Sequence, residues 1–280
     1  MKSTITVGIL CYNEKNLIWS CLQNLLPWAD KIIISDGTMH GTISGCELSA
    51  DELCKPSTDG TLECVNNAAN EYSNVFTMHL HNIPIMVEKD VRNIQYSMSD
   101  TDYFMIVDCD EIWDTPELKK LTDFLTDLRG KDATIRNFNF FYDGEHYIDQ
   151  RHKRIFRMIP NRLFYGNNEM AGEDYIEIPD DIFYFHYGFV DKEKVKQRCR
   201  LYDTPYYDYC GSWWYKSIYL KYDGTNFDEL CAKNGGTFHL FGKKHPGYGN
   251  WIINQKAIKH PEHIGHYLRR LGIDASYRSS

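Results

Sequence analysis

The segment Tyr103–Glu111, which reads YFMIVDCDE, joins an apolar run to an abrupt acidic end. Such a run indicates a strand buried on both faces, as in a parallel sheet. The carboxyl ends of these strands form the edge at which open α/β sheets bind ligands. There Asp108 and Asp110, two positions apart, can present oxygens to one divalent cation. An acidic turn before a helix would look the same, so the segment needs support from the rest of the chain.

The first half of the chain alternates strand-like and helical patterns, which predicts βαβ units on a mostly parallel sheet. We expect strands at Ile5–Leu10, Lys31–Ser35, Val75–Leu80 and Tyr103–Val107, and helices at Leu17–Leu26, Leu62–Tyr72 and Glu117–Leu128. Gly41–Gly60 is polar and predicts a surface loop. After Gly130 the pattern predicts extended aromatic segments at Ala133–Tyr142, Arg154–Met158, Asn161–Tyr165 and Ile182–His186, then a helix at Lys192–Tyr202.

Composition is that of an ordinary globular protein, with 42% hydrophobic and 25% charged residues among 280. The nine cysteines include no Cys-x-x-Cys pair, so neither a zinc site nor a disulfide framework is indicated. No apolar run approaches the roughly 20 residues of a membrane span, and the strand-like start lacks the features of a signal peptide. We therefore expect a cytoplasmic protein. The net charge of −8 argues against nucleic-acid binding.

Polar residues also follow the first two predicted strands. Cys11–Glu14 comes after Ile5–Leu10, and Asp36 with Gly37 comes after Lys31–Ser35. The ends of parallel strands share one edge, so these groups should converge into a pocket. There Asp36 can accept hydrogen bonds from a ribose or a base, and Asn13 can hold a planar base. Each group taken singly is also ordinary turn chemistry.

Four segments in this order resemble the motif series of family-2-like glycosyltransferases of the GT-A fold: Ile5–Glu14, Ser35–Thr42, Val91–Asn93 and Val107–Glu111. The resemblance implies a Rossmann-like, mostly parallel sheet flanked by helices, with a mixed acceptor-side half and a C-terminal helical extension. It implies a nucleoside held by Asn13, Glu14 and Asp36, and a metal and diphosphate held by Asp108 and Asp110. Arg92 would position the donor. The whole implied donor-binding set is Cys11, Asn13, Glu14, Asp36, Arg92, Asp108 and Cys109.

The second half resembles an Arg-Phe-Arg, His-Glu, His-Tyr-Gly series found in a subgroup that includes bacterial envelope-glycan transferases. The matching segments are Lys153–Arg157, Asn167–Glu169 and His186–Phe189, with Asn168 where the subgroup has His. By this resemblance His186 would contact the metal or the diphosphate. An inverting transfer also needs a general base for the acceptor hydroxyl, and a carboxylate with a raised pKa can serve. Glu169 is the first candidate, and Glu173 and Asp174 are its rivals.

The resemblance thus implies metal-dependent transfer, with Mn²⁺ or Mg²⁺, from a nucleoside-diphosphate sugar to a hydroxyl of a glycan or glycoconjugate. A UDP-sugar is favoured, and GDP or dTDP donors stay open. A catalytically silent nucleotide-sugar-binding protein is an alternative. A sugar-nucleotide pyrophosphorylase is less favoured, because the segment after the first strand has no glycine-rich loop to hold a triphosphate.

Residues 1–235 are predicted to form the catalytic domain, with a nucleotide-sugar-binding half over 1–115 and an acceptor-binding half over 116–235. Residues 236–280 would be a basic extension. The segment from His239 to the end contains seven basic residues and only two acidic ones. This positively charged tail is therefore a candidate for contact with an anionic membrane surface. A solvated face would account for it equally well. Lys192, Lys194 and Lys196 are interpreted as a solvated helix start.

Overall fold

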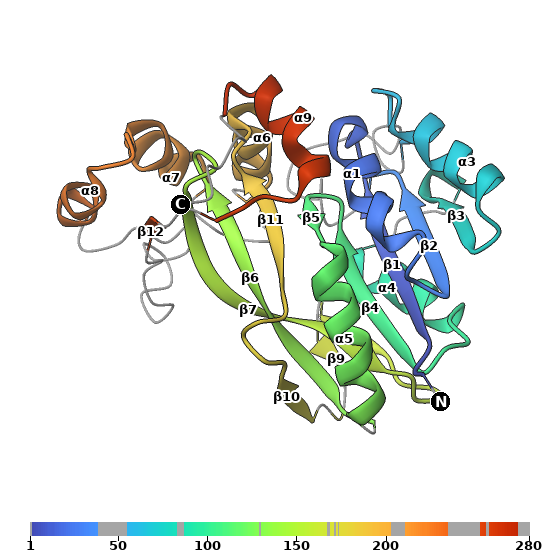
Figure 1. Cartoon of the computed structure of the whole chain (residues 1–280). Coiled ribbons are helices and arrows are strands. Elements are labelled where there is room, and N and C mark those ends of the chain that lie inside the picture. The colour runs from blue at the N-terminus through green and yellow to red at the C-terminus, as the bar shows by residue number, and fades with distance from the viewer. Residues whose placement is uncertain are drawn as a thin grey trace.

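A computed structural model describes residues 2–38, 55–82, 87–128, 130–166, 169–170, 172, 174–202, 211–234, 253–255 and 258–273. These residues form an α/β fold in which helices flank a curled central sheet (Figure 1). The longest path through this sheet has the strand order β3-β2-β1-β4-β7-β6-β11-β5. The expected α/β class is confirmed.

The first half forms the parallel part of the sheet. Its strands are β1 (Ile5–Cys11), β2 (Lys31–Asp36), β3 (Val75–His79) and β4 (Tyr103–Asp108), and every neighbouring pair among them is parallel. The connections contain α1 (Lys15–Leu25), α3 (Thr61–Glu71), the short η2 (Leu80–Asn82) and α4 (Glu88–Ser97). Parallel strands need such crossovers. The four predicted strands and the first two predicted helices are confirmed.

The second half continues the sheet with mixed directions. β7 (His146–Arg157) runs antiparallel to both β4 and β6 (Asp132–Phe141), while β11 (Phe183–Phe189) lies parallel to β6. β5 (Glu111–Ile112), β10 (Tyr175–Glu177) and β12 (Ile253–Gln255) pair at the margins, and β8 (Phe164–Gly166) with β9 (Glu169–Met170) forms a separate hairpin. The sequence predicted only the end of β7, because the five residues from Asp149 to Lys153 are polar on both faces.

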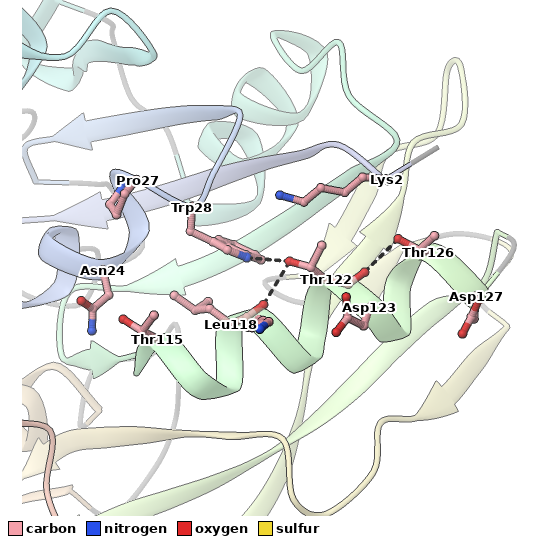
Figure 2. A pocket seen from close by; sticks show the side chains of 11 residues that line it. Lys2, Asn24, Pro27, Trp28, Thr115, Leu118, Thr122, Asp123, Thr126 and Asp127 are labelled. Atoms are coloured by element: carbon pink, nitrogen blue, oxygen red, sulfur yellow. Dashed lines mark hydrogen bonds between the residues drawn. The ribbon is translucent and has the colours of Figure 1, made fainter.

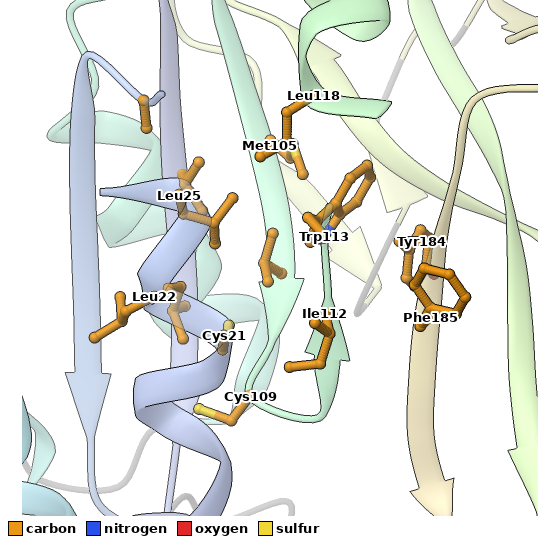
Figure 3. Close-up of a cluster of buried hydrophobic side chains, with 14 of the residues drawn as sticks. Cys21, Leu22, Leu25, Met105, Cys109, Ile112, Trp113, Leu118, Tyr184 and Phe185 are labelled. Atoms are coloured by element: carbon orange, nitrogen blue, oxygen red, sulfur yellow. The ribbon is translucent and has the colours of Figure 1, made fainter. Parts of the chain in front are cut away.

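Alternate residues of β4 pack on opposite faces of the sheet, as strand geometry requires. Tyr103, Met105 and Val107 join the main core, where they meet α1 and α5 (Thr115–Asp127). Figure 3 shows side chains of α1 close to β4 and to Trp113, with Tyr184 of β11 nearby. Phe104 and Ile106 face a smaller cluster that includes residues of α4 and β8. One strand therefore supports two packing layers.

The remaining helices cover the far end of the sheet. Residues of α6 (Lys192–Tyr202), α7 (Gly211–Ser217), η3 (Tyr219–Lys221) and α8 (Phe227–Lys233) form a third cluster with Phe141 of β6 and Ile148 of β7. The predicted bounds of α6 are confirmed. Within the described ranges, no helix is long and apolar enough to cross a membrane.

The described part of the basic tail packs into the main core. It contains η4 (Glu262–Ile264) and α9 (Gly265–Arg270), and Ile264, Tyr267 and Leu268 are core residues. His260 is buried and bonds to the hydroxyl of Tyr187 at 2.8 Å and to the carbonyl of Gly144 at 2.9 Å. This part of the tail is therefore integrated with the sheet. Membrane contact through the tail stays a prediction.

Candidate active site at the carboxyl ends of the parallel strands

Asp108, the last residue of β4, is held by two arginines. Arg92 of α4 donates to its Oδ1 at 2.8 Å and to the carbonyl of Gly8 at 3.0 Å, and Arg154 of β7 donates to its Oδ2 at 3.0 Å. Burial alone would raise the pKa of Asp108, but Arg154 and Arg92 keep that pKa below its usual value. The carboxylate is therefore ionised and fixed at the edge where a ligand would bind.

Asp110 lies in the turn after β4 and has two cationic or polar partners from the second half of the chain. Its Oδ1 is 3.2 Å from Nε2 of His186, and its Oδ2 accepts from Arg198 of α6 at 2.7 Å. Burial would raise the pKa of Asp110, but His186 and Arg198 hold it well below its usual range. The structure therefore brings together Asp108, Asp110 and His186, the three predicted metal ligands, in one cluster.

Gly188 lies against the charged side chains of the cluster. A Cβ at that position would lie 2.4 Å from Nη1 of Arg198, 2.8 Å from Nε2 of His186 and 3.1 Å from Oδ2 of Asp110. A larger residue at this position would therefore displace the ends of these three side chains, and Arg198 first.

Two further carboxylates complete the cluster. Glu111, which is fully buried, contacts Arg154, and burial raises the pKa of Glu111 to about 7 against the opposing effect of this arginine. Glu14 follows β1 and contacts Lys194 of α6, and burial likewise raises its pKa to about 7 although Lys194 lowers it. Acidic groups from the strand ends are thus matched by basic groups from α4, β7 and α6.

Arg154, Arg198 and Lys194 are site residues to which the sequence analysis gave no role. The interpretation of Lys194 as part of a solvated helix start is wrong, because its side chain contacts Glu14 across the site. Lys194 and Arg198 are four positions apart on α6, a spacing that places both side chains on one helix face. That spacing, next to a predicted acidic edge, was the available signal.

The predicted nucleoside pocket is built around Asp36 at the end of β2. This buried carboxylate accepts from the hydroxyl of Ser57 at 2.5 Å and from its backbone N–H at 3.1 Å. The same hydroxyl accepts from the backbone N–H of Asn13 at 2.8 Å, and the side chain of Asn13 accepts from Thr58 N–H at 2.9 Å. Asn13 has a φ of 55°, the left-handed region that Asn tolerates best after glycine. Asp36 and Asn13 therefore meet at one edge of the sheet.

Cys11 and Cys109 belong to this edge through their backbone, because their side chains turn inward. The thiol of Cys11 lies 3.6 Å from the carbonyl of Ser35, and the thiol of Cys109 lies 3.3 Å from the carbonyl of Leu10. Both residues are buried, and burial raises the pKa of Cys109 well above its usual range. Their thiols pack between β1, β2 and β4.

Asp110 and His186 are two side chains of this cluster whose atom types can ligate a divalent cation. Cis ligands of an octahedral ion with bonds near 2.1 Å are about 3 Å apart, and the 3.2 Å between Asp110 Oδ1 and His186 Nε2 fits that spacing. In the described ranges no group of three or more His, Cys, Asp or Glu side chains could hold a metal ion. Phosphate oxygens and water would have to complete the coordination, as is usual for Mg²⁺.

Of the three candidate bases, the structure describes Glu169 and Asp174, and no hydrogen bond or ion pair joins either of them to Asp108 or Asp110. Asp174 is exposed and pairs with Lys131 at 3.0 Å beside the start of β6, near the level at which β4 begins. It is separated from Asp108 by the length of β4, about 17 Å at 3.3 Å per residue, which is beyond the reach of a base acting there. Glu169 is exposed in the β8–β9 hairpin, which joins α4 through bonds between Asn93 and Phe164. Glu173 lies outside the described residues.

A depression of about 820 Å³ lies elsewhere, between the end of α1 and α5 (Figure 2). Trp28 and Thr122, joined by a 2.8 Å hydrogen bond, form part of its lining. None of the strand-end carboxylates lines it, so its size gives no reason to move the candidate site away from Asp108 and Asp110.

No protein-family model matches the sequence, and no curated protein matches it. Among solved structures, Staphylococcus aureus TarS is 14% identical over 71% of this chain and 38% of that chain, with a TM-score of 0.43. The chain therefore spans about two fifths of that protein. TarS residues 1–349 with UDP-GlcNAc are 12% identical over 88% of this chain and 73% of that one, with a TM-score of 0.45.

The mannosyltransferase PcManGT from Pyrobaculum calidifontis, solved with GDP-Man and Mn²⁺, is 15% identical over 71% of this chain and 62% of that chain, with a TM-score of 0.47. Identities this low and TM-scores below 0.5 say nothing about which reaction the present chain performs. We therefore build the proposed function on the site's own residues.

Proposed function

We propose that this protein transfers a sugar from a nucleoside-diphosphate sugar to a hydroxyl of a glycan or glycoconjugate. The observation that carries the proposal is the cluster at the ends of β1, β2 and β4, where Asp110 and His186 stand at the separation of neighbouring metal ligands. Asp36 and Asn13 lie at the same edge. A nucleoside-diphosphate donor has a nucleoside at one end and a charged diphosphate at the other. In this proposal Asp36 and Asn13 bind the nucleoside, and Asp110 and His186 lie at the diphosphate.

Each charged group has a defined part in this proposal. Asp36 and Asn13 bind the nucleoside, while Asp110 and His186 hold Mn²⁺ or Mg²⁺, which neutralises the diphosphate as it leaves. Arg198 is partly exposed, so it can exchange its bond to Asp110 for a phosphate oxygen when the donor and cation enter. Arg92 and Arg154, both buried, keep Asp108 ionised and fixed.

The acceptor side of the proposal is an inverting single displacement. A general base takes the proton of the acceptor hydroxyl while that oxygen attacks the anomeric carbon, and the diphosphate departs from the opposite face. Glu169 is the base we propose, with Glu173 as its remaining rival, because Asp174 lies at the far end of β4. The proposal is supported by the β8–β9 hairpin, which carries Glu169 and is attached to α4, the helix whose Arg92 bonds to Asp108.

Calorimetry with UDP, GDP and dTDP, each with Mn²⁺ or with EDTA, tests the donor site. We expect one nucleotide to bind in the presence of Mn²⁺, and Asp110→Ala to abolish that binding because it removes a ligand of the ion. Asp123→Asn, a change of an exposed carboxylate on α5, is the matched control and should bind like the wild type. Metal-independent binding, or equal binding by both variants, would refute the metal role of Asp110.

A catalytically silent nucleotide-sugar-binding protein would give the same binding result without turnover. Release of nucleotide from UDP-GlcNAc, UDP-glucose and GDP-mannose separates the two functions, since a transferase also hydrolyses its donor slowly. Nucleotide binding with no release from any donor, in the presence of Mn²⁺, would favour the silent protein.

A further inference from the structure

The depression between α1 and α5 is a second place in the molecule where a ligand has room, apart from the strand-end cluster. Its volume of about 820 Å³ is within the range of small-molecule sites in proteins. Seven of its eleven lining residues belong to α5, from Thr115 to Asp127, at alternating steps of three and one positions. Such steps keep residues on one helix face, which here is about 18 Å long at 1.5 Å per residue. We call this elongated depression the α5 groove (Figure 2).

An indole ring that is anchored to α5 forms part of the wall of this groove. Trp28 packs against the main core and is partly exposed, and it lines the α5 groove beside Pro27. Its N–H donates to the hydroxyl of Thr122 at 2.8 Å, and this hydroxyl donates to the carbonyl of Leu118 at 3.1 Å, as the dashed lines in Figure 2 show. Because α5 binds the polar end of the ring, the apolar ring atoms can contact a ligand with little loss of side-chain entropy.

The α5 side of the groove is polar, and the charges around the groove are balanced. Six of the seven lining residues on α5 are Thr, Lys or Asp. The side chains of Thr115, Lys119 and Asp123 are exposed and make no hydrogen bond within the described part of the chain. Two basic and two acidic residues line the groove: Lys2, Lys119, Asp123 and Asp127. The groove therefore offers donors and acceptors for hydrogen bonds without a net charge that would attract an ion.

We propose that the α5 groove binds a neutral oligosaccharide. A sugar ring has an apolar C–H face and a rim of hydroxyl groups that both donate and accept hydrogen bonds. The apolar face matches the indole of Trp28, and the rim matches the polar groups along α5, Thr115 and Asp123 among them. The elongated shape suits a chain of sugars better than a single unit. This inference goes beyond the proposed function, because the groove contains none of the residues proposed to hold the nucleotide or the metal.

Other classes of ligand match the α5 groove less well. A polyanion such as a nucleic acid needs an excess of basic side chains for its phosphates, and the groove has equal numbers of basic and acidic residues. The apolar face of a partner helix needs an apolar groove, whereas the α5 side is polar at six of its seven positions. The balanced charges and the polar wall together favour an uncharged ligand that is rich in hydroxyl groups.

Calorimetry with neutral hexasaccharides of glucose, mannose and N-acetylglucosamine tests the α5 groove. We expect at least one of them to bind the wild type, and Trp28→Ala to weaken that binding tenfold or more. Asp123→Arg should weaken it similarly, because the larger side chain fills the groove and an acceptor is lost. Asp123 is exposed, so the melting temperature of this variant should stay near that of the wild type. Trp19→Ala is the matched control: this tryptophan is 45% exposed on α1 and lies outside the groove, so oligosaccharide binding should be unchanged.

The outcomes separate this binding site from the proposed donor site. Absence of hexasaccharide binding to the wild type overturns the inference, as does wild-type affinity in Asp123→Arg or an equal loss in Trp19→Ala and Trp28→Ala. Tighter binding of hexagalacturonate, an anionic hexasaccharide, than of every neutral one also overturns it. Nucleotide binding, measured in the same samples with Mn²⁺, should be preserved in all three variants. If the wild type binds a hexasaccharide but no nucleotide, the donor function fails while the α5 groove stands.

Discussion

Arg154 and Arg198 both hold carboxylates of the strand-end cluster, but they differ in burial. This difference predicts that removing Arg154 mainly lowers stability, whereas removing Arg198 mainly weakens nucleotide binding. The side chain of Arg154 is 4% exposed and contacts Glu111, which is completely buried, whereas that of Arg198 is 28% exposed. Removing one partner of a buried ion pair costs about 3–5 kcal/mol. Arg154→Met should therefore lower the free energy of unfolding by that amount, or the melting temperature by on the order of 10 °C.

Arg198→Met should cost only about 1 kcal/mol, because water can reach the carboxylate that it leaves and partial exposure weakens the pair. It should nevertheless weaken nucleotide binding tenfold or more, since this arginine is proposed to reach the diphosphate. Urea unfolding and calorimetry on the two variants measure both quantities. Combining Arg154→Met with Glu111→Gln should recover more than half of the lost stability, because a neutral amide avoids the cost of either burying the Glu111 charge or protonating its carboxyl group. Equal stability losses in the two single variants, or no recovery in the double variant, would refute the reasoning.

Two further predictions concern Glu14 and Glu169. The folded pKa of Glu14 is about 7 against the usual 4.5, so its contribution to stability is full below pH 4.5 and is lost as pH rises through 7, by roughly 3 kcal/mol. Glu14→Gln should flatten this dependence in urea unfolding between pH 5 and pH 8, and a profile identical to the wild type would disprove the assignment. Glu169→Gln should lower the transfer rate at least a hundredfold while nucleotide affinity survives. A normal rate in Glu169→Gln beside a slow Asp174→Asn would show that the base lies at the other carboxylate.

The strands that carry the site could be predicted because their signals are local. An apolar run followed by Asp108 or Asp36 marks both a buried strand and its carboxyl end, and the parallel order of the strands brings those ends together. The sequence alone therefore predicted that the candidate metal-binding and nucleoside-binding residues lie at the same edge of the sheet. The helix α6 was likewise predicted within its observed bounds, since its pattern is confined to eleven residues.

The cationic half of the site could not be predicted, because its contacts join distant parts of the chain. Lys194 meets Glu14 across 180 positions, and Arg154 meets Asp108 across 46. The spacing of Lys194 and Arg198 was the only local signal, and it does not say which face of α6 packs against the sheet. The part of β7 before Arg154 was missed for a related reason: from Asp149 to Lys153 the residues on both faces of the strand are polar. Tertiary placement alone gives these residues their role.

Asp110 and Arg198 are 88 positions apart in the sequence, so the ribosome synthesises Asp110 well before its partner. The chain is synthesised from the amino terminus, so the residues of the parallel strands and their acidic edge leave the ribosome before those of α6. Until then Asp110 and Glu14 lack the cations that balance them, and like charges repel at that edge. When α6 docks, Lys194 and Arg198 pair with Glu14 and Asp110 and neutralise this acidic edge. Competence to bind a donor should therefore arise late in biogenesis, as one of the last properties that the nascent protein acquires.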